Sequence, residues 1–139
     1  AAVRQTCFRL EYFSDEIKAD REVVMHAVEK DPSDFQFASV SLRADKHIAL
    51  TAVSQLGEQL EYASDALRGD RDVVLAAVRQ NGLSLEFACD ALRGDRDVVF
   101  AAVRQNGRSL EYAPNLLCGD RELVTIAVAQ DGTAVQFAQ

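Results

Sequence analysis

The hydrophobic positions of this chain recur at a fixed spacing of 25 residues. Residues 68–82 read RGDRDVVLAAVRQNG, and residues 93–107 repeat them with Phe100 in place of Leu75. A valine series and an aromatic series keep the same spacing: Val3, Val28, Val53, Val78, Val103 and Val128, and Tyr12, Phe37, Tyr62, Phe87, Tyr112 and Phe137. Self-similarity at a fixed period of this length is typical of a stacked repeat architecture.

A first helix of about ten residues is predicted in each repeat, as at 71–80. An aspartate precedes it, and aspartate is a strong N-cap because its carboxylate accepts otherwise unpaired amide hydrogens. The helix should end at Asn81-Gly82, where glycine can adopt the left-handed conformation. The predicted caps are Asp20, Asp45, Asp70, Asp95 and Asp120 at the start, and Gly82 and Gly107 at the end. Residues 73–78 carry no polar side chain, so this helix is expected to be covered on several sides.

A second helix is predicted at 84–93 and at its equivalents. Ser84 is the expected N-cap. Leu85, Ala88 and Leu92 fall at i, i+3 and i+7, which places them on one helical face. Each repeat is therefore expected to be a hairpin of two helices.

Two prolines depart from this consensus. Pro32 stands where Gly82 stands in a later repeat, and it cannot supply a left-handed stop, so a different turn is expected there. Pro114 follows the first turn of its predicted second helix, where its ring would clash with the carbonyl four residues back. A kink or a late start of that helix is expected.

The pattern predicts an all-α solenoid of about five and a half helix-turn-helix repeats. Valine favours strands, but the alanine pair, the aspartate cap and the glycine favour a helix. The predicted units lie near 1–19, 20–44, 45–69, 70–94, 95–119 and 120–139. Because the chain begins and stops inside a repeat, it is expected to be a fragment of a longer array or a piece whose ends are covered by partners.

Units of the form LRGDRDVVLAAVRQNGLSLEFA resemble the repeats of domain-of-unknown-function family 4116. The resemblance rests on the tandem elements D-R-[DE]-V-V, A-A-V-x-Q-N-G and L-E-[YF]-A and covers essentially the whole chain. The family has no general assigned activity and occurs as tandem arrays in protists, algae and some intracellular bacteria. The resemblance therefore implies a repeat fold and supplies no catalytic residue.

Composition and charge narrow the class of partner. A net charge of −7 opposes the phosphate backbone that dominates nucleic-acid binding, so nucleic acid is an unfavoured partner. No apolar run reaches the roughly 18 residues that indicate a membrane span, although association with a membrane complex stays open. Cys7, Cys89 and Cys118 form an odd set without a C-x-x-C pair, which favours free thiols and a reducing compartment, the cytoplasm or an organelle stroma.

For each candidate chemical site in the sequence, a structural explanation is stronger than a functional one. The Arg-Gly-Asp triplet at 68–70 joins a helix stop to a helix cap, so an adhesion motif is not expected. His26 and His47 lie in different repeats and lack the close ligand pairs of a metal site. Pairs such as Glu61 and Asp65 recur between repeats, as a solvated acidic stripe would. We expect no enzyme activity, catalytic residue, cofactor or metal.

Positions that vary between repeats are the candidate recognition sites. Three slots of the first helix change: Met25, Leu50, Leu75, Phe100 and Thr125; His26, Thr51, Ala76, Ala101 and Ile126; Glu29, Ser54, Arg79, Arg104 and Ala129. The first two slots could simply adjust core packing. Arg79, Gln80, Arg104 and Gln105 are the predicted protein-binding residues, because they are polar and stand at helix ends.

The function expected from these observations is a non-catalytic protein-interaction or scaffolding module. One form of it is an accessory subunit of a larger complex, which the distribution of the resembling family allows to be organellar or photosynthetic. A nucleic-acid-binding helical repeat and a non-catalytic part of a larger effector or enzyme stay open as alternatives.

Overall fold

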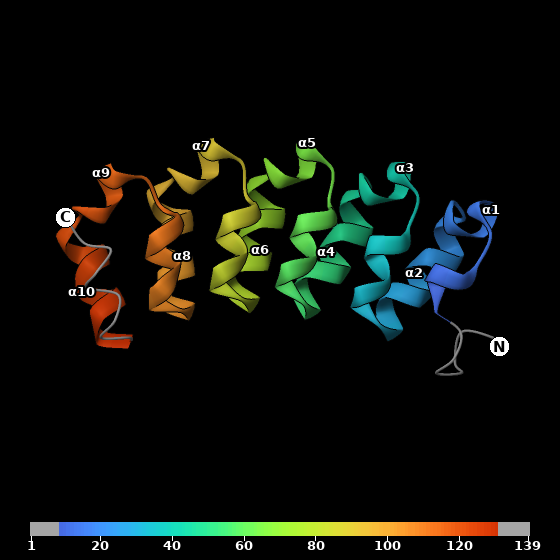
Figure 1. Ribbon diagram of the computed structural model, residues 1–139, viewed down its shortest axis with the longest axis horizontal. Helices are drawn as coiled ribbons and strands as arrows, with labels where there is room; N and C mark the ends of the chain where they lie inside the picture. Colours follow the sequence, from blue (N-terminus) through green and yellow to red (C-terminus); the bar gives the residue numbers. More distant parts are fainter. Residues whose placement is uncertain (1–8, 131–139) are drawn as a thin grey trace.

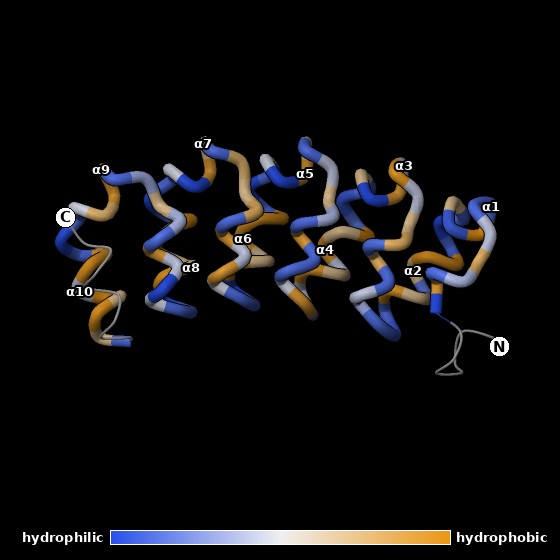
Figure 2. Tube along the Cα trace, viewed as in Figure 1, coloured by the Kyte–Doolittle hydropathy of each residue, from blue (hydrophilic) through white to orange (hydrophobic). Residues whose placement is uncertain are grey.

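The computed structural model describes residues 9–130 as an array of stacked helical repeats, so the predicted all-α solenoid is confirmed (Figure 1). One row holds ten-residue helices: α2 (Arg21–Lys30), α4 (Lys46–Gln55), α6 (Arg71–Gln80), α8 (Arg96–Gln105) and α10 (Arg121–Gln130). A second row holds the 3-10 helices η2 (Leu10–Tyr12), η3 (Pro32–Phe37), η4 (Gly57–Tyr62), η5 (Gly82–Phe87) and η6 (Gly107–Tyr112). One-turn helices follow along one edge: α1 (Asp15–Lys18), α3 (Val40–Arg43), α5 (Asp65–Arg68), α7 (Asp90–Arg93) and α9 (Asn115–Cys118). Hydrophobic residues recur in every repeat and in both rows (Figure 2).

The long helices begin at aspartates. In α6 the Asp70 carboxylate accepts the amide hydrogens of Asp72 and Val73, at 2.9 and 3.3 Å. Equivalent pairs of bonds are made by Asp20, Asp45, Asp95 and Asp120. Each carboxylate satisfies two donors that have no partner inside the helix, which fixes the start of the helix.

The long helices bury one face and expose the other. Val73, Val74, Ala77 and Val78 of α6 are fully buried between the two rows. Arg71, Asp72, Arg79 and Gln80 are exposed, while Leu75 and Ala76 are half-buried. The expectation that this helix is covered on several sides is confirmed, because α4 and α8 pack against it within its own row and η4 and η5 pack against it from the second row.

The predicted second helix is interrupted in every described repeat. In place of one helix at 84–93, the chain forms η5, leaves helical geometry at Ala88 and Cys89, and then forms α7. The Cys89 amide donates across the repeat boundary to the carbonyl of Arg68, at 3.0 Å, and the Ser39 and Ser64 amides make the same bond to Lys18 and Arg43. A continuous helix would use these amides internally, so pairing between repeats breaks the helix.

Ser84 is therefore not an N-cap. It lies inside η5 and is buried, and the side chain of Asn81 caps this helix by accepting the amide hydrogen of Leu83.

Gly82 and Gly107 do not end the long helices in a left-handed conformation, which corrects that prediction. Glycines with positive φ do not occur in the described chain, and the residue after α6 is the extended Asn81, with φ of −147°. Both glycines begin a 3-10 helix that packs tightly against the next repeat. A Cβ on either would lie less than 3.0 Å from a backbone oxygen, that of Ala102 or Ala127.

The two prolines fit the common backbone without a special turn. Asp31, before Pro32, has φ of −142°, close to that of Asn81, and Pro32 begins η3 as glycine begins η4, η5 and η6. Pro114 occupies the interruption that every described repeat has, so it causes no separate kink. The helix after Pro114 does start late, as expected, but the corresponding helix starts late in every described repeat.

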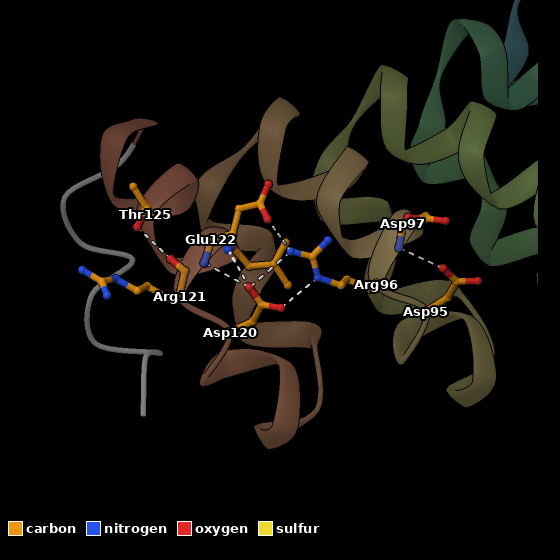
Figure 3. A network of polar contacts seen from close by, with 8 residues as sticks. Asp95, Arg96, Asp97, Asp120, Arg121, Glu122 and Thr125 are labelled. Carbon is orange, nitrogen blue, oxygen red and sulfur yellow. Dashed lines mark hydrogen bonds and ion pairs between the residues drawn. The ribbon is translucent and has the colours of Figure 1, made fainter.

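A ladder of ion pairs joins consecutive repeats. The first residue of one long helix reaches the aspartate cap and an acidic residue of the next, as Arg96 reaches Asp120 at 2.8 Å and Glu122 at 2.7 Å (Figure 3). Arg21, Lys46 and Arg71 make the corresponding contacts with Asp45, with Asp70 and Asp72, and with Asp95 and Asp97. The bond from Arg96 lowers the pKa of Asp120, which also accepts two backbone amides. The ladder therefore holds adjacent helix caps in register.

Candidate functional site

A groove of about 540 Å³ lies between α6 and α8 on the exposed side of the long helices. We name it the α6–α8 groove, and it is lined by Arg71, Leu75, Arg79, Asp97, Phe100, Ala101, Arg104 and Gln105. Arg71, Leu75 and Arg79 follow one another at intervals of four residues, which puts them on one side of α6. The groove thus runs along the helices and is open to solvent along its length.

Two of the three arginines in the groove have no acidic partner. Arg71 pairs with Asp97 at 3.2 Å and with Asp95 at 3.5 Å. The Arg79 side chain has no hydrogen-bond or ion-pair partner within the described part of the chain. The Arg104 guanidinium lies over the Phe100 ring, 5.9 Å from its centre, and meets no carboxylate of the described residues. Two unneutralised cations therefore lie along one groove of an acidic protein.

The base of the groove is apolar. Leu75 and Phe100 are half-buried and pack against the core from the exposed side of their helices. Ala101, whose side chain is small, also lines the groove. An apolar surface flanked by arginines can hold a hydrophobic side chain while neighbouring acidic groups pair with the guanidinium groups.

The four predicted binding residues divide into two roles. Arg79, Arg104 and Gln105 line the α6–α8 groove, whereas Gln80 does not. Gln80 and Gln105 accept the amide hydrogens of Gly57 and Gly82 of the preceding repeat, at 2.6 and 2.5 Å. Their side-chain oxygens therefore hold repeats together, a role that sequence reasoning missed.

Other groove residues could be found only in part from the sequence. Leu75, Phe100 and Ala101 belong to the variable slots, but the sequence did not decide between packing and recognition for them. Arg71 and Asp97 were missed as groove residues, although the spacing of Arg71, Leu75 and Arg79 is a usable signal of a shared helical face.

The charge of this face changes along the array. The slot of Arg79 and Arg104 holds Glu29 and Ser54 in earlier repeats and Ala129 in a later one. A similar hollow on α4, with Lys46, His47, Leu50, Thr51 and Ser54, has no arginine. The cationic groove is thus confined to the repeats of α6 and α8 in the part of the chain that is described.

The other candidate groups of the sequence are the Arg-Gly-Asp triplet, the possible metal ligands and the cysteines, and in the described residues they do not form a site. Asp70 of the Arg-Gly-Asp triplet caps α6 and pairs with Lys46 at 3.2 Å. Over residues 9–130, no three histidine, cysteine or acidic side chains converge as a metal site would require. Cys89 and Cys118 are free thiols, and burial raises the pKa of Cys118; Cys7 lies outside the described residues. None of the described helices has the length and apolar character needed to cross a bilayer.

Comparison with known proteins identifies the repeats. The family model described as "Domain of unknown function (DUF4116)" matches three consecutive segments, residues 1–43, 45–93 and 95–139. Each segment spans close to two 25-residue repeats. No curated protein and no solved structure matches the sequence.

Proposed function

The chain belongs to the DUF4116 family, and we propose that it is a non-catalytic protein-interaction module. The observation that supports this function is the α6–α8 groove, in which unpaired Arg79 and Arg104 flank the apolar Leu75 and Phe100. Arginine beside aromatic side chains is the composition typical of energetic centres in protein interfaces. We propose an accessory role in a larger complex as one form of this function, because such a surface would serve to attach the chain to a partner.

The partner that fits this groove is an acidic segment with a hydrophobic side chain. Guanidinium groups form strong, often bidentate bonds with carboxylates, while Leu75 and Phe100 offer apolar contact between them. The protein as a whole carries a charge of −7, so an acidic partner gains attraction only where the arginines are unpaired. Charge complementarity therefore directs such a segment to the α6–α8 groove.

Selection from a random phage-displayed peptide library tests this function. Peptides enriched on the protein should combine aspartate or glutamate with a leucine-sized or aromatic residue. The double variant Arg79→Ser/Arg104→Ser should bind them at least about tenfold more weakly, because the charge-assisted bonds are lost.

The matched control is Arg108→Ser/Arg121→Ser, which removes the same charge from exposed residues outside the groove. This control should bind like the parent protein. Enriched peptides without acidic residues, or equal binding to the two double variants, would show that the groove is not the interaction site.

A further inference from the structure

A second pocket, of about 440 Å³, lies on the row of 3-10 helices, away from the α6–α8 groove. We name it the η4–η5 pocket, and it is lined by Ser33, Gln36, Leu56, Glu58, Gln59, Glu61, Tyr62, Asn81, Leu83, Ser84, Glu86 and Phe87. Three of these side chains are carboxylates, and none of the described residues in the lining is basic. The pocket therefore concentrates negative charge beside the rings of Tyr62 and Phe87.

Two buried polar atoms in the lining lack a hydrogen-bond partner. Gln59 is 3% exposed and Ser84 is 1% exposed, and neither Gln59 Oε1 nor Ser84 Oγ is bonded within the described structure. Leaving a buried acceptor unpaired costs about 1–3 kcal/mol, so such atoms indicate a place where a donor is needed. Ser109 Oγ, in the same slot of the next repeat and outside the pocket, is unbonded as well, so the combination of such atoms with three carboxylates is what distinguishes the η4–η5 pocket.

The aromatic series shows which donor is missing. The Tyr62 hydroxyl bonds to Glu61, which raises the pKa of Tyr62. Two repeats later, Tyr112 bonds to both Glu111 and Glu86, and burial together with these carboxylates raises its pKa to about 12. The intervening residue of the series is Phe87, whose ring has no hydroxyl. A tyrosine at residue 87 would donate to Glu86 and Glu61, so these carboxylates keep the donors Tyr112 and Tyr62 but lack the further donor between them.

We propose that the η4–η5 pocket binds an arginine side chain of a partner polypeptide. A guanidinium carries five N–H donors, which matches the acceptors Glu61, Glu86 and Gln59, and its planar group stacks on aromatic rings. The methylene stem of arginine can lie against Leu56 and Leu83 at the apolar side of the pocket. This site goes beyond the proposed groove interaction and does not depend on it.

Peptide titration followed by NMR tests the proposal. The probes are acetyl-Gly-Arg-Gly-amide and the same peptide with citrulline, which keeps the shape of arginine without its charge. The arginine peptide should shift the ring resonances of Tyr62 and Phe87 saturably. The citrulline peptide should bind with an affinity at least about tenfold lower. A lysine peptide that bound as tightly as the arginine peptide would overturn the assignment to guanidinium.

The decisive variant is Phe87→Tyr, since other repeats hold tyrosine in this slot and the fold tolerates it. Its hydroxyl should occupy the donor position and weaken binding of the arginine peptide about tenfold, as should Glu61→Gln or Glu86→Gln. Glu29→Gln, on the long-helix row, makes the same charge change and should bind like the parent protein. Parent-like binding by Phe87→Tyr, or an arginine peptide that gives no saturable shifts, would overturn the proposal. The double variant Arg79→Ser/Arg104→Ser should leave this binding unchanged, which separates failure here from failure of the groove.

Discussion

Gly82 lies directly against the backbone carbonyl of Ala102 in the next repeat. A Cβ at residue 82 would approach that oxygen to less than 3.0 Å, and it would also meet Ser109 Oγ within the same limit. The oxygen belongs to the backbone of α8 and cannot move aside as a flexible side chain would. This contact sets how closely adjacent repeats can stack.

Gly82→Ala is therefore expected to destabilise the array. Forcing a methyl group into this contact should lower the free energy of unfolding by about 1–3 kcal/mol, as overpacking of a tight interior does. Urea denaturation followed by circular dichroism measures it. Gly94→Ala is the matched control, because a Cβ there would meet its nearest atom only at 3.6 Å. Equal stability of the two variants would show that the close approach does not limit stacking.

Gln105→Ala should destabilise the protein by removing the acceptor of the Gly82 amide. Gly82 is buried, and an unpaired buried amide costs about 1–3 kcal/mol. Gln55→Ala is a control supplied by the chain itself, because the corresponding residue is Pro32, which has no amide hydrogen to donate. Gln55 bonds instead within its own helix, to the carbonyl of Thr51. Chemical denaturation should separate the variants, and a Gln55→Ala loss as large as that of Gln105→Ala would contradict the assigned role.

In the Arg96→Gln variant, the stability of the protein should change less as the pH falls into the acidic range. Because the bond from Arg96 lowers the pKa of Asp120 in the folded protein, its stabilisation is fully present above the unfolded pKa of about 3.9 and is lost as pH falls through the folded pKa. The denaturation midpoint of Arg96→Gln should thus lie below that of the parent at pH 7 and approach it at about pH 2.

Arg121→Gln is the control for this pH series. Arg121 occupies the same place on α10, but its side chain has no carboxylate partner in the described residues and points away from the Arg96 network (Figure 3). Its midpoint should follow that of the parent at every pH. A gap between parent and Arg96→Gln that persists unchanged into acid would contradict the ion-pair explanation.

Pro114→Ser should stabilise the array. Ser39, Ser64 and Cys89 donate their amide hydrogens to the preceding repeat, but Pro114 has none for the carbonyl of Arg93. Serine restores this donor and adds a side-chain cap like that of Ser64. These gains should exceed the cost of losing the rigidity of proline, so the free energy of unfolding should rise by about 0.5–1 kcal/mol. The thermal midpoint should rise in calorimetry. A lower midpoint would mean that the repeats of α7 and α9 do not pair in the way that the earlier repeats do.

The sequence predicted the groove cations and missed the second pocket. Arg79 and Arg104 could be found because they are polar residues in a variable slot of a recognisable helix. Ser84 was interpreted as a helix cap and Gln59 gave no signal, since only the packing of η4 against η5 buries them. Glu61 and Glu86 were interpreted as a solvated stripe because the sequence does not show that both line one pocket and that Phe87 leaves them without a shared donor.

The sequence by itself determined the repeat, its period and the ten-residue helices, because aspartate caps and apolar spacing act within a few residues of one another. Tertiary structure decided the form of the second helix and the roles of glycine and glutamine. The amides of Ser39, Ser64 and Cys89 bond to a carbonyl 21 residues earlier, and Gly82 bonds to a glutamine 23 residues later. Local propensity favours a continuous helix and a left-handed glycine, but buried backbone groups must be paired, and between stacked repeats those pairs exist only across the boundary.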